Sequence, residues 1–200
     1  MTSALFIVDM QNDFIEGGSL AVTGGEKAAL RLAEQLALNE HSAAFAFPDI
    51  IVTSQDWHIN PGNHWSETPD YVDTWPVHCA ADTEGAAIRK ELADAIAQRV
   101  KAGAIHLEIV KGEYEAAYSA FEGRAKKGSL KTVTHLLHEL GVDALEVVGI
   151  ATDHCVKATV MDGLEAGFKV YVLTEFIAGV DEARSREAIL AMGDAGAHYL

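Results

Sequence analysis

The sequence predicts an α/β fold of three layers, in which helices cover both faces of a central, mostly parallel β-sheet. Short apolar runs alternate along the chain with longer segments of helical periodicity. The apolar runs do not alternate strictly with polar residues, which is typical of strands buried on both faces. The 200 residues contain no repeat and no linker, so we expect one domain that spans residues 1–200.

Five apolar runs have the length and composition of buried strands. The run at 49–53, for example, is rich in β-branched residues, which favour strands. We expect strands at residues 4–8, 49–53, 105–110, 145–150 and 169–173.

Five longer segments have the periodicity of amphipathic helices. In the first of them, Leu32 and Leu36 lie on the same apolar face. In the third, Ser129 is a candidate N-cap and Gly141 ends the helix. Because these segments alternate with the strands, the strands should pair in parallel between two layers of helices. We expect helices at residues 26–40, 85–100, 129–140, 155–165 and 181–193.

The stretch 56–84 differs from the rest of the chain. It holds three of the four prolines, all three tryptophans and three histidines, with little periodicity. An ordered loop of this length usually carries function.

Composition argues against several classes of partner. The chain has 15 basic and 30 acidic residues, a formal net charge of −15, which suits neither nucleic acid nor an anionic membrane. No apolar stretch has the length of a membrane span, and the run at 4–8 is too short for a signal peptide. The two cysteines, Cys79 and Cys155, form no disulfide framework. Free thiols fit a reducing cytoplasm.

Polar side chains that could take part in catalysis or metal binding follow the predicted strands. Asp9 follows the first strand, Asp56 and His58 follow the second, and Lys111 follows the third. Cys155 stands five residues beyond the fourth strand, where the next helix should begin. Since ligands bind at the carboxyl edge of such sheets, we expect these groups to meet there.

Cys155 is the candidate nucleophile. A thiol at a helix N-terminus faces unpaired amides and the positive end of the helix dipole, and both favour the thiolate. Asp9 is the candidate base, and Lys111 would keep Asp9 ionised. His154 is a weaker candidate for proton transfer and a stronger one for supporting hydrogen bonds, because neighbouring helical residues point in different directions.

The loop at 56–84 is a candidate metal site. In an extended segment residues i and i+2 point the same way, so Asp56 and His58 can reach one ion, and His64 and His78 could complete its shell. One carboxylate and up to three imidazoles suit Zn, Fe(II) or Mn(II); the alternative is that the histidines are ordinary loop donors. We interpret Cys79 as structural. Two further acidic residues should be solvated, Glu113 and Glu115.

Several segments resemble the nicotinamidase/pyrazinamidase branch of the isochorismatase-like cysteine hydrolases, over residues 4 to about 180. The strings Gly-Ile-Ala-Thr-Asp-His-Cys-Val and Asp-x-His with a following His are specific signatures. The matching segments are Ile7–Phe14, Gly17–Val22, Asp56–His64, Thr74–Cys79, Lys111–Gly112, Ala117–Gly123 and Val147–Val156.

The resemblance implies a role for each matching residue. It implies Asp9, Lys111 and Cys155 as the catalytic triad, and a cis peptide between Ile150 and Ala151. The amides of Ala151 and Cys155 would form the oxyanion hole. It further implies two sets of binding residues: Asp56, His58, His64 and His78 for one divalent transition metal ion (Zn, Fe or Mn), and Phe14, Trp75, Tyr118 and His154 around the substrate.

The function implied is hydrolysis of nicotinamide, and of pyrazinamide, to the acid and ammonia through a Cys155 thioester. Another small amide, a carbamoyl compound or an isochorismate-type ether is the alternative substrate, and a metal-storing or interaction module with an inactive site is the alternative class. We expect a small-molecule partner, no nucleic acid or membrane partner, and a monomer or homo-oligomer.

Overall fold

The predicted three-layer α/β fold is confirmed by a computed structural model, which describes residues 1–38 and 47–200. Within these residues, seven strands form one sheet in the order β4-β3-β2-β1-β5-β6-β7. All neighbouring strands pair in parallel except β3 and β4. The strands are β1 (Ser3–Val8), β2 (Ile50–Asp56), β3 (Ile105–Lys111), β4 (Arg124–Ala125), β5 (Ala144–Ile150), β6 (Lys169–Ala178) and β7 (His198–Tyr199).

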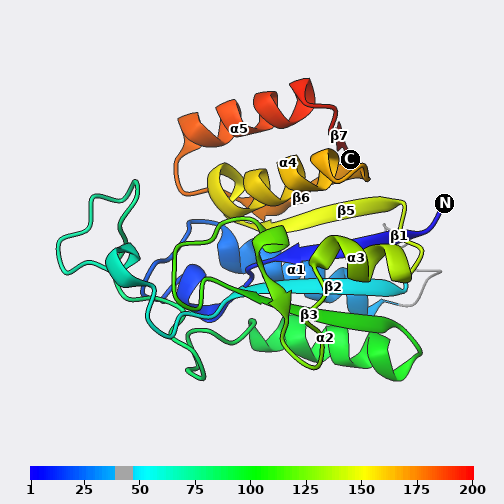
Figure 1. Ribbon diagram of the computed structural model, residues 1–200, viewed down its shortest axis with the longest axis horizontal. Coiled ribbons are helices and arrows are strands. Elements are labelled where there is room, and N and C mark those ends of the chain that lie inside the picture. The colour runs from blue at the N-terminus through cyan, green and yellow to red at the C-terminus, as the bar shows by residue number, and fades with distance from the viewer. Residues whose placement is uncertain (39–46) are drawn as a thin grey trace.

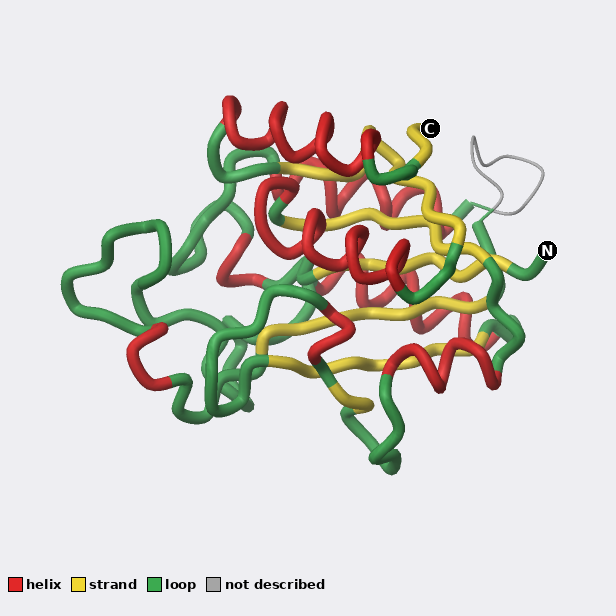
Figure 2. The backbone as a smooth tube through the Cα atoms, turned by 45° about the horizontal axis from the view of Figure 1, so that its top comes forward, coloured by secondary structure: helices red, strands yellow, loops and turns green. Residues whose placement is uncertain are grey.

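In the described part of the chain, five α-helices cover the two faces of the sheet (Figures 1 and 2). Helices α1 and α2 pack on one face, and α3, α4 and α5 pack on the other. The helices are α1 (Gly25–Ala37), α2 (Lys90–Lys101), α3 (Val133–Glu139), α4 (Lys157–Glu165) and α5 (Glu182–Asp194).

The central strand β1 explains why its sequence lacks alternation. Leu5 and Ile7 belong to the apolar core beneath α1 and α2, whereas Phe6 and Val8 belong to the core beneath α3, α4 and α5. Both faces of the strand are therefore buried, and each position needs an apolar side chain.

Several boundaries differ from those predicted. The second helix begins at Lys90 rather than residue 85, and the third at Val133 rather than 129. Thr132, not Ser129, is the N-cap, because its hydroxyl accepts from the amide of His135. The predicted end of the first helix, residues 39–40, lies outside the described residues. The short strands β4 and β7 were not predicted.

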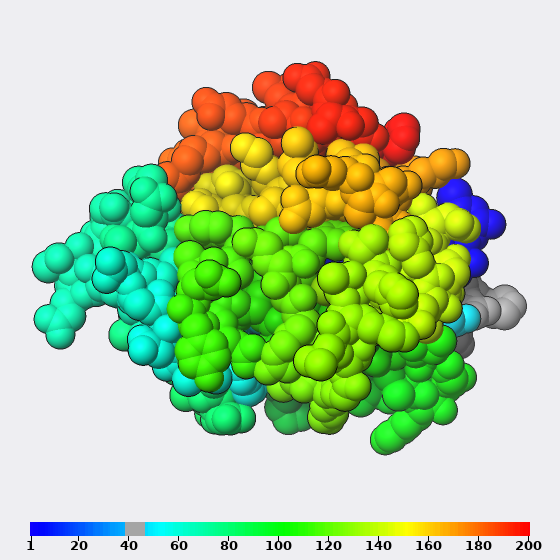
Figure 3. All heavy atoms as spheres, viewed as in Figure 1, coloured from blue at the N-terminus to red at the C-terminus, as the bar shows by residue number. Residues whose placement is uncertain are grey.

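The long segment between β2 and α2 projects from the carboxyl end of the sheet. It is coloured cyan to green in Figure 1, and Figure 3 shows its cyan and teal part standing out from the body of the molecule. Among the described residues, no helix has both the length and the apolar character needed to cross a membrane.

Gly149 is required where β5 packs against β1. Its φ is +129°, and a Cβ there would lie 2.1 Å from the carbonyl oxygen of Val8. We expect Gly149→Ala to lower the free energy of unfolding by about 3–5 kcal/mol, through backbone strain and the clash with a main chain that cannot give way.

Gly167→Ala is the matched control for this substitution. Gly167 also has a positive φ, +89°, but a Cβ there would meet nothing within 4 Å. Gly167→Ala should lower the free energy of unfolding by only about 1–2 kcal/mol, because it adds backbone strain and no clash. Urea unfolding measures both, and equal losses would show that the contact with Val8 is unimportant.

Candidate active site

A pocket of about 410 Å³, its open mouth included, lies at the carboxyl end of the central strands. All four predicted substrate-binding residues line it, together with Cys155, Ala151 and three of the predicted metal ligands. The lining residues are Phe14, Leu20, Val22, Asp56, His64, Trp75, His78, Tyr118, Ile150, Ala151, His154, Cys155 and Val180.

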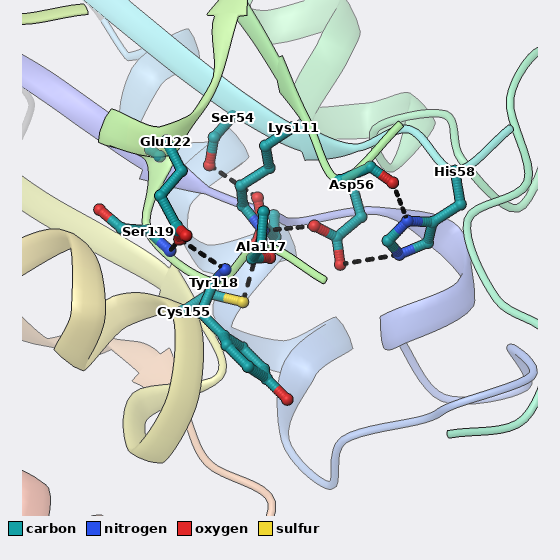
Figure 4. Close-up of polar contacts among 12 residues, drawn as sticks. Ser54, Asp56, His58, Lys111, Ala117, Tyr118, Ser119, Glu122 and Cys155 are labelled. Atoms are coloured by element: carbon teal, nitrogen blue, oxygen red, sulfur yellow. Dashed lines mark hydrogen bonds and ion pairs between the residues drawn. The ribbon is translucent and has the colours of Figure 1, made fainter. Parts of the chain in front are cut away.

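The ammonium of Lys111 connects the predicted groups. Lys111 and Asp56 are register partners at the ends of β3 and β2, and their side chains form a close ion pair. Lys111 Nζ also lies 3.0 Å from Asp9 Oδ2 and 3.6 Å from Cys155 Sγ, and it donates to the Ala117 carbonyl at 3.1 Å. Figure 4 shows this side chain between Cys155 and Asp56.

Electrostatics explain why this lysine remains charged. The Lys111 side chain is 0% exposed, and burial alone would lower its pKa. The carboxylates of Asp56 and Asp9 outweigh burial and raise the pKa well above its ordinary value. The same ammonium lowers the pKa of Asp56 against the opposing effect of burial.

Asp9 stands at the turn that follows β1, with a positive φ of 47°. Its Oδ1 accepts a hydrogen bond of 2.6 Å from Ser54 Oγ, and its amide donates to the Ser54 carbonyl. Burial raises the pKa of Asp9 despite the nearby Lys111. A carboxyl whose pKa is raised in this way is a stronger proton acceptor than a solvated one.

Cys155 lies in a single π-helical turn, Thr152–Val156, between β5 and α4. The cis peptide predicted between Ile150 and Ala151 is confirmed directly before this turn. The expectation of a favoured thiolate is wrong, because burial raises the pKa of the Cys155 thiol well above its ordinary value and outweighs the attraction of Lys111. A thiol with a raised pKa needs a base before it can react as a thiolate.

The three loop histidines converge at the other end of the pocket. One ligand atom from each of His58, His64 and His78 can be chosen so that all three lie within 4.8 Å of one another. The Nε2 atoms of His58 and His78 are 3.2 Å apart, and Asp56 Oδ2 lies 3.6 and 3.9 Å from them. Burial lowers the pKa of His64 to about 4 and also lowers that of His78, so both rings are neutral.

The donor set fits a divalent metal ion. Nδ1 of His58 donates to the Gly112 carbonyl at 2.5 Å, and Nδ1 of His78 donates to the Pro76 carbonyl at 2.7 Å. Their Nε2 lone pairs then face each other beside the Asp56 carboxylate, an arrangement that a cation stabilises. Gly112 permits the first contact, because a Cβ there would lie 2.6 Å from the His58 ring.

Aromatic side chains form the walls between these two ends. Trp75 Nε1 donates to the Tyr118 hydroxyl at 3.2 Å, and the ring centroid of Phe14 lies 5.5 Å from that of His78. The His154 ring lies 5.3 Å from Trp75 and 5.9 Å from Tyr118. The walls suit a flat aromatic molecule of one ring.

Some residues that support these groups were not predicted from the sequence. Asp153 is the largest omission: its side chain is 1% exposed, accepts from the amides of Val180 and Asp181, and pairs with Arg184 Nε at 3.3 Å. It ties the Cys155 turn to the connection between β6 and α5. The only sign of this role of Asp153 in the sequence is its position next to His154, near Cys155.

The two acidic residues that follow Lys111 also differ from each other. Glu113 was expected to be solvated, yet it is partly buried and binds the Arg124 guanidinium through both oxygens, at 2.6 and 2.8 Å. Glu115 is exposed, as predicted. Cys79 is fully buried, and its thiol has a pKa raised mainly by burial.

Comparison with known proteins identifies relatives across the whole chain. The model of the isochorismatase domain family matches residues 3–200. A nicotinamidase/pyrazinamidase of Mycobacterium tuberculosis is 44% identical over 177 residues, which cover 88% of this chain and 87% of that protein.

Solved structures agree with this match. PnC1 from L. infantum, in complex with nicotinate, has a TM-score of 0.73 at 33% identity, covering 100% of this chain and 92% of that chain. The pyrazinamidase of Pyrococcus horikoshii, in complex with zinc, has a TM-score of 0.71 at 29% identity, covering 100% of this chain and 99% of that chain.

The fold and these relatives place the chain among hydrolases built on a mostly parallel α/β sheet. More narrowly, the chain belongs to the isochorismatase domain family.

The buried contacts of Asp153 predict how the stability of the fold depends on pH. The His154 ring, whose Nδ1 lies 3.4 Å from Asp153 Oδ1, and the hydrogen bond from the Val180 amide hold the pKa of Asp153 below its ordinary value of 3.8, although burial acts in the opposite direction. Because the folded-state pKa is lower than the unfolded one, the charged carboxylate stabilises the fold above about pH 4, and this stability is lost as the pH falls.

Asp153→Asn should therefore lower the free energy of unfolding by about 1–3 kcal/mol at pH 7. This difference from wild type should shrink below pH 4. Asp194→Asn, at an exposed position in α5, is the control. Denaturant unfolding between pH 7 and pH 3 measures the effect. A difference that stays constant over this range would mean that the charge of Asp153 does not stabilise the fold.

Proposed function

We propose that the protein hydrolyses nicotinamide to nicotinate and ammonia, and also hydrolyses pyrazinamide. The observation that carries this proposal is that Asp9, Lys111 and Cys155 meet beside a set of metal-type ligands, at a pocket that Cys155 and three of those ligands line. The names of its relatives support it: a nicotinamidase/pyrazinamidase and a protein in complex with nicotinate.

Cys155 is the nucleophile and Asp9 is the base in this proposal. Asp9 takes the proton of the neutral thiol, and Lys111 stabilises the thiolate from 3.6 Å. The thiolate attacks the carboxamide carbon, and the carbon–nitrogen bond breaks as protonated Asp9 gives its proton to the leaving nitrogen. Ammonia departs and a thioester remains. Water then cleaves the thioester: its oxygen joins the carboxylate, one of its protons restores the thiol, and the other is released and taken up by ammonia in solution.

The amides of Ala151 and Cys155 would form the oxyanion hole. Both belong to the turn between β5 and α4, and both residues line the pocket. Loss of one such donor typically reduces the rate about 10²–10³-fold.

Four side chains would hold one divalent metal ion: Asp56, His58, His64 and His78. The zinc in the related pyrazinamidase supports this assignment, and Fe(II) or Mn(II) suits the same ligands. When bound, the metal would accept the ring nitrogen of the substrate and so orient it. Phe14, Trp75, Tyr118 and His154 enclose the ring.

We also propose that residues 1–200 form a single domain that works in the cytoplasm. Helices from both halves of the chain cover one continuous sheet, which supports a single domain. The two free, buried thiols fit a reducing compartment.

An ammonia-release assay with nicotinamide tests the proposed activity. Cys155→Ala should abolish turnover and leave the fold and the metal content intact, because only the nucleophile is lost. Cys79→Ala is the matched control, since this second buried thiol should be dispensable for the reaction. Substantial activity in Cys155→Ala would remove covalent catalysis, and an inactive but folded Cys79→Ala would mean that the wrong thiol was assigned.

A second experiment separates the metal from the triad. Removing the metal should reduce kcat/KM for nicotinamide far more than for benzamide, which has no ring nitrogen to bind. Asp9→Asn should reduce both alike, because it removes the group that accepts the thiol proton and returns it to ammonia.

The measurement is kcat/KM for both amides in wild type, metal-free protein and Asp9→Asn. Equal losses for both amides on metal removal would contradict the orienting role. They would indicate that the ion is structural or acts on the carboxamide end of the substrate.

A further inference from the structure

Gln11 makes contacts that the reaction does not explain. Its side chain is fully buried near the pocket, two residues beyond Asp9. Its Oε1 accepts from the Asp56 amide at 2.8 Å, and its Nε2 donates to the Asp56 carbonyl at 2.7 Å. Nε2 also donates to the Ala86 carbonyl at 2.9 Å. The Gln11 side chain therefore hydrogen-bonds both the main-chain amide and the main-chain carbonyl of Asp56, whose carboxylate faces the histidines.

Asp13 makes the corresponding contact at the other end of the loop. Its Oδ2 accepts from the Cys79 amide at 2.7 Å, and the Cys79 carbonyl accepts from the His58 amide at 3.0 Å. Both the main-chain amide and the main-chain carbonyl of Cys79, the residue after His78, are therefore hydrogen-bonded. Gly85 packs against this carboxylate so closely that a Cβ would lie 2.2 Å from Asp13 Oδ2.

The segment that carries Gln11 and Asp13 is itself fixed to a second stretch of chain. The amide of Asn12 donates to the Ala87 carbonyl at 2.9 Å, and the amide of Asp13 donates to the Gly85 carbonyl at 3.0 Å. The Gln11 and Asp13 side chains therefore extend from a stretch of backbone that is itself hydrogen-bonded to the segment 85–87. Such a backbone can hold a long loop in place.

We propose that Gln11 and Asp13 are positioning residues for the metal site: they hold the two ends of the segment 56–79, which carries all four ligands. The inference rests on the proposed metal site and adds the reason for its geometry. Neither residue is among the groups proposed to touch metal or substrate. Each acts through a main-chain amide next to or within a ligand residue, and partners of this kind typically change metal affinity about 10–100-fold when removed.

Gln55 offers a matched control. Its Nε2 donates to the same Ala86 carbonyl, at 2.7 Å, and it too is buried, but its Oε1 accepts from Lys126 Nζ at 3.4 Å and not from the Asp56 main chain. Gln11→Met and Gln55→Met are both uncharged replacements of similar size. The first removes the bonds to Asp56 and one bond to Ala86, whereas the second removes a bond to Ala86 and the bond from Lys126. An effect that comes from the Ala86 carbonyl alone therefore appears in both.

The experiment measures the dissociation constant of Zn²⁺ in competition with a chelator. We expect Gln11→Met and Asp13→Ala to weaken zinc binding about 10–100-fold. Gln55→Met should bind zinc as wild type does. Asp13→Asn should also bind near wild-type strength, because its amide oxygen can still accept from Cys79. Thermal unfolding of the metal-free proteins shows which variants are folded.

Two results would overturn the inference while leaving the proposed metal site intact. One is wild-type zinc affinity in folded Gln11→Met or Asp13→Ala. The other is an equal loss in Gln11→Met and Gln55→Met, which would assign the effect to general packing around Ala86. If Gln11→Met does not fold, Asp13→Ala against Asp13→Asn decides. A wild-type protein that binds no zinc would instead contradict the proposed metal site.

Discussion

The buried ammonium of Lys111 is the interaction on which the pocket depends. A charge removed from water is costly unless it is paired, and this one has two carboxylates, a carbonyl and a thiol around it. It forms ion pairs with the carboxylates of both Asp9 and Asp56. The proposed reaction end and the proposed metal end of the pocket are therefore parts of one charged cluster, and neither can be arranged without the other.

Sheet order explains how four residues far apart in sequence come to share this cluster. The strands β3, β2, β1 and β5 are neighbours in that order, and all four run in parallel. Lys111, Asp56 and Asp9 therefore come to one edge side by side, and Cys155 joins them from the turn after β5. Asp56 ends the strand next to β3 and Asp9 follows the strand after that, so the Lys111 side chain reaches both carboxylates from one side.

The sequence predicted the residue types at this edge better than their surroundings. An aspartate or lysine after an apolar run is visible in one dimension, whereas Ser54 and Asp153 act through contacts across 45 and 27 residues, which have no local signal. The helix expected from Ser129 fails for a related reason. Ser129 and Thr132 are both good caps by residue type, and the structure has the second, whose hydroxyl accepts from the amide of His135.

The Cys155 thiol shows most clearly where a local argument ends. A helix terminus favours the thiolate, but burial acts on the same atom more strongly and keeps it neutral. Burial also raises the pKa of Asp9, so the two proton-exchanging groups of the proposed mechanism are shifted in the same direction. Because Lys111 contacts both, moving the proton from Cys155 to Asp9 leaves the total charge beside the ammonium unchanged. The cluster thus pays the cost of burying charge when it folds, and the proposed transfer only moves a negative charge from one partner of Lys111 to another.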